Sequence, residues 1–374
     1  MLRRPGIAFA LTLAGFIGAG AAPAAAYDPK PLPIGSPAPD FALPGVDGKT
    51  HALRDFASSR VLVVLFTCNH CPTAQAYEER VAKFHAEYKD RGVALVAISP
   101  NDAAAVRLDE LGYTDLDDSF EAMKIRARDH KYTYPYLYDG ETQAVSKAFG
   151  VLATPHVFVF GPDRKLAYAG RWDDAEVKRP VKSPDLLNAV NALLEGRAVP
   201  VATTRPFGCS TKWSDKRQSA VDSLAKWNAE PVSLEKIDDA GVAKLVKNDT
   251  PNLLVVNLWA TWCGPCVEEL PAFVEMHRMY RGRKFKMVTI SMDEPDKADE
   301  ALKVLKENHA STTNYLLRTT DRDRFAEALD KEWPGPLPYT MIIVPGGKVV
   351  YRKSGAIEPL DVKRAIVSVL GRTY

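Results

Sequence analysis

Two short runs of almost purely hydrophobic residues mark the chain, Val61–Phe66 and Leu253–Trp259. Short apolar runs rich in β-branched residues are typical of strands buried on both faces of a sheet. Each run leads into two cysteines separated by two residues, Cys68 and Cys71 in the first case and Cys263 and Cys266 in the second. The order of strand, cysteine pair, helix and strand therefore occurs twice.

The two halves keep this parallel as far as their last helices. The pattern predicts helices over Pro72 to Tyr88 and Val267 to Tyr280, and buried strands over Val93 to Ser99 and Phe285 to Ser291. Turns with Gly, Pro or Asp then predict a hairpin and a final helix in each half. The predicted strands are His156 to Phe160, Lys165 to Ala169, Tyr339 to Val344 and Lys348 to Arg352, and the helices are Ser183 to Leu194 and Pro359 to Leu370.

A chain of 374 residues with 46% hydrophobic residues is large enough for two domains. We assign residues 34–200 to a first domain and 231–374 to a second. Residues 27–33 form a proline-rich lead-in, and residues 201–230 are interpreted as a linker with late elements of the first domain.

Residues 1–26 have the three-part pattern of an export signal: Arg3 and Arg4, an apolar run, then Ala24 to Ala26. A membrane anchor is the alternative, but the run is short of the roughly 20 residues that a spanning helix needs. We expect cleavage after Ala26 and a soluble protein, not inserted in a membrane, in the periplasm or cell envelope. Such compartments are oxidising.

The charge is balanced, with 49 Lys and Arg residues against 47 Asp and Glu. The basic residues are scattered rather than clustered. Nucleic acid is therefore not an expected partner.

The two cysteine pairs carry the candidate chemistry. A pair with this spacing can cycle between dithiol and disulfide, and a helix N-terminus favours the thiolate of the first cysteine. We expect Cys68 and Cys263 to attack a substrate disulfide, and Cys71 and Cys266 to resolve the mixed disulfide. No cofactor beyond the cysteines is expected. One zinc shared by both pairs and inert structural disulfides remain alternatives.

Cys209 is the fifth cysteine and has no predicted partner. Gly208 and nearby prolines favour a loop. An odd thiol in an exported protein is reactive, intermolecular or inert. We expect it to approach Cys68 and Cys71 and to join a mixed disulfide.

The second half resembles thioredoxins. Trp262-Cys263-Gly-Pro-Cys266 resembles a thioredoxin active site, and the continuation to Glu269 and Pro271 resembles the TlpA/ResA branch of exported thioredoxin-like proteins. The resemblance implies that Glu269 lies near the thiols and influences their protonation. An exposed helix carboxylate is the alternative. Asn257 stands where classical thioredoxins have a buried aspartate.

The first half resembles a different branch. Residues 34–41 resemble the alkyl hydroperoxide reductase/peroxiredoxin group, and Cys68-Asn-His-Cys71-Pro72 resembles a peroxiredoxin-like thioredoxin family. Three further segments match the same family: Tyr136 to Asp139, Ala153 to Pro155 and Gly208 to Trp213. True peroxiredoxins place a threonine three residues before the reactive cysteine, where this chain has Leu65.

These resemblances imply an α/β protein with two thioredoxin-like domains, each a central mixed β-sheet flanked by helices. They also imply cis-prolines at Pro155 and Pro338, facing the cysteine pairs. His70 resembles the histidine of exported disulfide oxidants. We therefore expect the first pair to be the more oxidising, with electrons passing from the second pair to the first.

The expected function is thiol–disulfide exchange with protein substrates, as a reductase supplied by a membrane dithiol electron donor. A thiol-dependent peroxidase, with the second domain recycling the first, is the alternative. A metal-binding or scaffold module is the third possibility.

Overall fold

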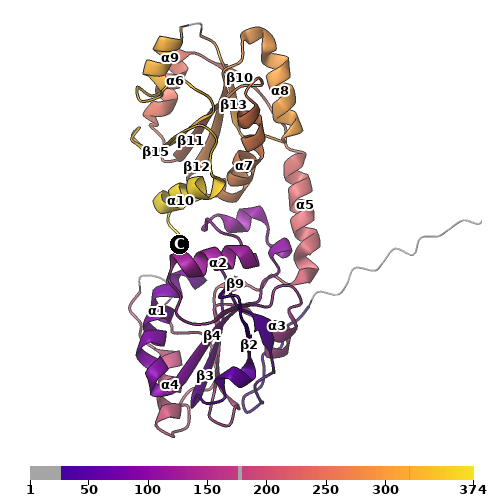
Figure 1. Cartoon of the computed structure of the whole chain (residues 1–374), viewed down its shortest axis with the longest axis vertical. Helices are drawn as coiled ribbons and strands as arrows, with labels where there is room; N and C mark the ends of the chain where they lie inside the picture. The colour runs from indigo at the N-terminus through magenta and orange to yellow at the C-terminus, as the bar shows by residue number, and fades with distance from the viewer. Residues whose placement is uncertain (1–26, 176–178, 320) are drawn as a thin grey trace, which may run out of the picture.

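The structure, a computed structural model, describes residues 27–175, 179–319 and 321–374. The predicted export signal lies outside these ranges. The chain forms two α/β domains that are joined by helix α5 (Arg217–Asn228), which runs along one side of the molecule from one domain to the other (Figure 1). No helix within the described ranges has the length and apolar character needed to cross a membrane.

The first domain has a five-stranded mixed sheet with strand order β5-β4-β3-β7-β8. Strands β3, β4 and β5 are parallel to one another, β7 is antiparallel to β3, and β8 is antiparallel to β7. The strands are β3 (Val61–Phe66), β4 (Val93–Ser99), β5 (Tyr136–Tyr138), β7 (His156–Phe160) and β8 (Leu166–Gly170). The helices are α1 (Pro72–Tyr88), α2 (Phe120–Asp129), α3 (Ala144–Phe149) and α4 (Asp185–Leu194).

Alternate residues of β3 face two separate cores. Val61, Val63 and Leu65 pack against α1, α2 and α4. The side chains between them, such as Val64, pack against α3 and Trp213 on the other face. This period of two explains the unbroken hydrophobic run, since both faces of the strand are covered.

The second domain has a six-stranded sheet with strand order β10-β13-β12-β11-β14-β15. The central strand β11 is parallel to β12 and antiparallel to β14. The strands are β10 (Glu235–Ile237), β11 (Leu253–Trp259), β12 (Phe285–Ser291), β13 (Thr313–Leu317), β14 (Tyr339–Ile343) and β15 (Val349–Ser354). The helices are α6 (Asp239–Lys247), α7 (Gly264–Tyr280), α8 (Ala298–Glu307), α9 (Arg322–Leu329) and α10 (Pro359–Leu370). The predicted fold class, a mixed sheet flanked by helices in each half, is confirmed.

Two expectations about the connecting segment need correction. Residues 217–228 form helix α5, which the sequence analysis left without secondary structure because none of its side chains is buried and no apolar face stands out. Cys209 lies in a two-residue strand, β9 (Cys209–Ser210), rather than a loop. Strand β9 pairs with β6 (Ala153–Thr154), as β1 (Ala42–Pro44) pairs with β2 (Thr50–Ala52).

The C-terminal half of α7 forms one of the contacts between the two domains. Leu111, at the end of a short 3₁₀ helix in the first domain, is buried in a cluster with Phe273, Met276 and Tyr280 of α7. The Tyr280 hydroxyl donates a hydrogen bond to the Thr114 carbonyl over 2.8 Å. The C-terminal half of α7 thus helps to anchor the second domain, together with ion pairs from α10 and the C-terminal residues.

Leu111→Ala should weaken this anchor. Truncating a buried leucine costs about 2–5 kcal/mol, from lost apolar contact and the cavity left behind. We expect calorimetry to show a lower midpoint of thermal unfolding. We also expect a larger difference between the unfolding temperatures of the two domains. The control is Leu224→Ala on α5, where the side chain is 43% exposed. The same unfolding temperatures in both variants and in the wild type would contradict the anchoring role.

Candidate active sites

Both cysteine pairs lie where the central strand of a sheet ends and a helix begins, but the helices start in different registers. Helix α1 starts after Cys71, so Cys71 is its N-cap residue. Helix α7 starts after Cys263, so in the second domain the first cysteine is the N-cap. The unpaired N–H groups at the helix start therefore lie against different members of the two pairs.

The second centre is closed as a Cys263–Cys266 disulfide, with 5.3 Å between the Cα atoms. Cys266 is fully buried, Cys263 is 7% exposed, and the neighbouring Trp262 is 66% exposed. Leu337, which precedes Pro338 in a cis peptide bond, packs against the cluster that contains the disulfide. Leu337 and Trp262 also line a cavity of about 310 Å³, which therefore lies beside the disulfide although neither cysteine lines it.

Glu269 is buried one helical turn after Cys266, which excludes the alternative of an exposed helix carboxylate. Its carboxylate accepts hydrogen bonds from the Asn257 amide over 2.9 Å and from the backbone N–H of Ile357 over 3.0 Å. Burial raises the pKa of the Glu269 carboxyl, although both hydrogen bonds act in the opposite direction. Asn257 therefore does not take the place of the buried carboxylate of classical thioredoxins. It donates a hydrogen bond to the Glu269 carboxylate, which helix α7 supplies.

The first centre contains two free and buried thiols. Cys68 is 3% exposed and Cys71 is fully buried. Cys68 Sγ lies 3.2 Å from the Thr154 hydroxyl, and Cys71 Sγ lies 3.1 Å from the Thr154 carbonyl oxygen. Thr154 precedes Pro155 in a cis peptide bond, so the cis-proline segment contacts both sulfurs through one residue.

Cys71 receives more hydrogen bonds than Cys68. The backbone N–H groups of Ala74 and Cys209 donate to Cys71 Sγ over 3.4 and 3.3 Å. Burial opposes its thiolate, but hydrogen bonds from Cys209 and Cys68 and the charge of His70 outweigh this and lower the pKa of the Cys71 thiol. Burial, followed by the hydrogen bond to Cys71, raises the pKa of the Cys68 thiol. The electrostatics thus favour the thiolate at Cys71, whereas the sequence prediction places the nucleophile at Cys68.

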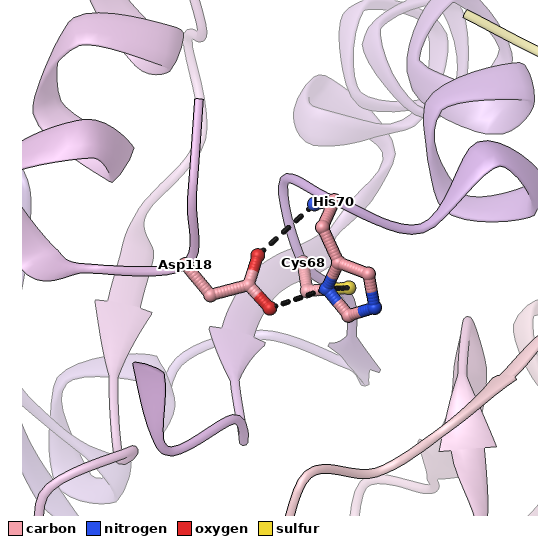
Figure 2. Close-up of side chains that lie close together, drawn as sticks. All are labelled: Cys68, His70 and Asp118. Carbon is pink, nitrogen blue, oxygen red and sulfur yellow. Dashed lines mark hydrogen bonds and ion pairs between the residues drawn. The ribbon is translucent and has the colours of Figure 1, made fainter. Parts of the chain in front are cut away.

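Asp118 holds the turn between the two cysteines (Figure 2). One carboxylate oxygen accepts from the backbone N–H groups of Asn69 and His70, over 2.9 and 3.0 Å. The other accepts from His70 Nδ1 over 2.6 Å and from the Asn101 amide over 2.7 Å. Burial lowers the pKa of His70, but the charge of Asp118 outweighs burial, so the pKa of His70 is raised and its protonated form is favoured beside the thiols.

This geometry limits the chemistry of His70. Its Nδ1 atom faces Asp118 and also lies 3.6 Å from Cys68 Sγ, so the same nitrogen serves both contacts. A nucleophilic triad instead uses one ring nitrogen for the acid and the other for the nucleophile. The contribution of His70 to the thiols is thus electrostatic: in its protonated form it lowers the pKa of the Cys71 thiol.

Metal binding was left open by the sequence. Ligand atoms of Cys68, His70 and Asp118 lie within 4.8 Å of one another, all buried. Both Asp118 oxygens already accept two hydrogen bonds each, so a metal would have to displace them. The four paired cysteines do not come together in the described part of the chain, which excludes one zinc shared between the pairs in this arrangement.

The predicted relay between the centres also lacks a contact. The C-terminal end of α7 touches the first domain, whereas Cys263 and Cys266 are at its N-terminal end. A helix of this length spans about 25 Å at 1.5 Å per residue. A disulfide needs Cα atoms within about 7 Å, so the arrangement shown does not allow direct exchange between the two pairs.

Sequence reasoning missed the residues that hold each turn from a distance. Asp118 and Asn101 follow β4, and Asp293, which accepts hydrogen bonds from the Thr261 N–H and hydroxyl, follows β12. All three lie in irregular segments without a motif. One signal was available: all three residues follow β4 or β12, the strand next to the central strand of each sheet. The carboxyl ends of parallel strands meet at one edge of the sheet, so residues that follow these strands lie near the cysteines.

Comparison with known proteins agrees with this organisation. A 114-residue segment is 28% identical to the thiol-disulfide oxidoreductase ResA of Geobacillus thermodenitrificans, covering 30% of this chain and 61% of that relative. The chain thus spans less than two thirds of the curated relative's length.

Two solved structures are similar to about half of this chain. A hypothetical protein from Sinorhizobium meliloti 1021 is 34% identical, with a TM-score of 0.45, over 50% of this chain and 97% of that one. An uncharacterized conserved protein from Geobacillus kaustophilus is 39% identical, with a TM-score of 0.44, over 49% of this chain and 93% of that one.

The family model for AhpC/TSA proteins matches twice, over residues 34–169 and 224–352. Each match covers the central strand and the cysteine pair of one domain. The chain therefore belongs to the AhpC/TSA family.

Proposed function

We propose that the protein is an exported thiol–disulfide oxidoreductase that reduces disulfides of protein substrates, with the second domain as the principal reductase. The observation that carries the proposal is the Cys263–Cys266 disulfide at the start of α7, next to an exposed tryptophan and an open cavity. A curated relative that bears the name thiol-disulfide oxidoreductase supports the same chemistry.

In the reduced second centre, the N–H groups at the start of α7 stabilise the Cys263 thiolate. This thiolate attacks a substrate disulfide, forms a mixed disulfide and releases the first substrate thiolate. The Cys266 thiolate then attacks Cys263 Sγ, which releases the second substrate thiol and closes the Cys263–Cys266 disulfide. Cys266 is buried, so it must lose its proton inside the protein, and the buried Glu269 is one turn away.

The cycle needs two electrons to reopen the disulfide. In an oxidising compartment they must come from a dedicated donor, and a membrane protein that carries a dithiol is the partner we propose. The first centre serves separate clients, because its cysteines do not reach the second pair in this arrangement.

A peroxidase is less well supported. Leu65 stands where peroxiredoxins have their threonine and is a buried apolar residue of β3. The polar side chain beside the first pair is instead His70, whose Nδ1 lies 2.6 Å from the Asp118 carboxylate.

Cys263→Ser in the full chain should abolish insulin reduction driven by dithiothreitol, because the attacking sulfur is lost. Cys68→Ser is the matched control and should retain most of the wild-type rate. Peroxide consumption, followed in parallel, should stay at the background rate. Unchanged insulin reduction by Cys263→Ser, or rapid peroxide turnover by the wild type, would refute the proposal.

Glu269→Gln should change how stability depends on pH. The folded state raises the pKa of this carboxyl above its ordinary value of 4.5, so between 4.5 and the raised pKa the folded state holds more protons than the unfolded one. The wild type therefore loses stability from this group as the pH rises through that window. Denaturant unfolding from pH 4 to 8 should show a flatter profile for Glu269→Gln. The exposed Glu268 gives the control, Glu268→Gln, and parallel profiles for all three proteins would contradict the assignment.

The thiolate of the reduced first centre should belong to Cys71. In a full chain that also carries Cys263→Ser and Cys266→Ser, absorbance at 240 nm reports thiolate as the pH is raised. We expect Cys68→Ser to keep a thiolate that titrates below the ordinary thiol pKa of about 8.5, and Cys71→Ser to lose it. The reverse result would restore Cys68 as the thiolate of this pair.

A further inference from the structure

Strand β9 pairs with β6, the short strand that leads into cis-Pro155 beside the first centre, and the two form a separate two-stranded sheet. Strand β9 runs antiparallel to β6, with Cys209 opposite Thr154 and Ser210 opposite Ala153. Thr154 is the residue whose side chain and carbonyl contact both sulfurs. A free strand edge at such a place can bind an extended peptide through backbone hydrogen bonds. In this domain the chain's own segment takes that place.

The corresponding segment of the second domain, before its cis-proline, has no such partner strand within the described residues. Leu337 stands before cis-Pro338 as Thr154 stands before cis-Pro155. In the ranges that the structure describes, no strand pairs with Leu337, which lines a cavity instead. The same position is therefore covered in one domain and accessible in the other.

Gly208 makes the close approach of β9 possible. Its φ is +136°, and a Cβ atom there would lie 2.1 Å from the Thr154 carbonyl oxygen. Any other residue would have to push β9 away from Thr154. The absence of a side chain at Gly208 thus allows β9 to pack directly against Thr154.

Cys209 is also the most accessible sulfur of the three. Cys68 and Cys71 are buried, whereas Cys209 is only half-buried. A cavity of about 410 Å³ adjoins β9 and is lined by Leu152, Arg205, Phe207 and Ser210 among others. Cys209 does not line this cavity itself, but of the three cysteines it is the one that is only half-buried, so a disulfide or thiol from solvent meets it before the buried pair.

We propose that Cys209 is the third redox cysteine of the first centre: it forms a disulfide with Cys71 and exchanges it with substrates. The proposal rests on the thiol–disulfide exchange proposed above. The backbone N–H of Cys209 lies 3.3 Å from Cys71 Sγ, and the two side chains pack in one cluster with Cys68.

Cys68 and Cys71 are free thiols, and the oxidant that joins them is a disulfide from solvent, which takes up the two electrons and leaves as two thiols. The Cys209 thiolate attacks Cys71 Sγ, the bond to Cys68 breaks, and Cys68 leaves as a thiolate that takes up the proton lost by Cys209. A substrate thiolate then attacks Cys209 Sγ and expels the Cys71 thiolate. A second substrate thiolate attacks the sulfur of the first, frees Cys209 and leaves the substrate oxidised and the centre reduced.

The electrostatics favour the later step, in which a substrate thiolate attacks Cys209 and Cys71 leaves as a thiolate. Thiols with a lower pKa are better leaving groups in thiol–disulfide exchange. Cys71 is the sulfur of this centre whose pKa is lowered, and its hydrogen bond with Cys209 is the main cause that raises the pKa of the Cys209 thiol. The attack at Cys209 therefore expels the better-stabilised thiolate.

Disulfide mapping tests the proposal in the full chain with Cys263→Ser and Cys266→Ser, so that only three thiols remain. The reduced protein is treated with limiting oxidised glutathione, quenched with acid, alkylated and digested for mass spectrometry. We expect peptides linked through Cys71–Cys209 besides Cys68–Cys71, and Cys71–Cys209 alone in Cys68→Ser. Complete alkylation of Cys209 at every time point would overturn the proposal.

A second test measures the rate of reaction with glutathione disulfide and uses a Gly208 variant that displaces β9. Cys209→Ser should slow the reaction of glutathione disulfide with the buried pair by about tenfold. Gly208→Val should reduce the Cys71–Cys209 link to a similar extent and leave Cys68–Cys71 intact. Gly282→Val is the control, because a Cβ atom at Gly282 meets nothing within 4 Å. An unchanged rate in Cys209→Ser, or an unchanged link in Gly208→Val, would contradict the proposal.

Insulin reduction by the otherwise wild-type chain separates this inference from the proposed function. Loss of the function would appear as absent insulin reduction, which depends on Cys263. Failure of the inference alone would leave insulin reduction intact, with Cys209 never linked to Cys71.

Discussion

The end of a fully buried central strand is the constraint on which both centres depend. β3 and β11 pack on both faces and pair with neighbours on both edges, so their ends cannot shift. The cysteines that follow are delivered to the same edge of each sheet, beside a cis-proline segment and the start of a helix. What each pair can do is then decided by groups that approach this edge from elsewhere in the chain.

Strands and helices near the cysteines were predictable because their signals are local. The hydrophobic run of β3, the turn chemistry of the hairpins and Pro72 at the start of α1 all act within a few residues. Helix α5 was missed for the same reason, since it buries no side chain and offers no periodic pattern. The hydrogen bonds of Asp118 with Asn69 and His70 span almost fifty residues, and no local pattern encodes them.

The role of individual cysteines was harder to predict than their importance. Identical spacing suggested identical roles, yet helix α1 begins at Pro72, after its second cysteine, and α7 begins at Gly264, after its first. The two residues between the cysteines determine where each helix begins. Asn69 and His70 present their N–H groups to Asp118, which holds them outside the helix, whereas Gly264 and Pro265 form the first helical turn.

The difference between the two centres is therefore a difference in solvation as much as in charge. The second pair has one slightly exposed sulfur next to an exposed tryptophan, and the pair is already oxidised. The first pair is sealed by β9 and surrounded by a buried charged network, so its thiolate gains from fixed donors rather than from water. Fixed donors act without reorganisation when charge develops, and a buried thiolate needs them because no water can replace them. A buried dithiol can exchange disulfides with a substrate only through a group of the segment that covers it. In this chain the covering strand β9 contains Cys209.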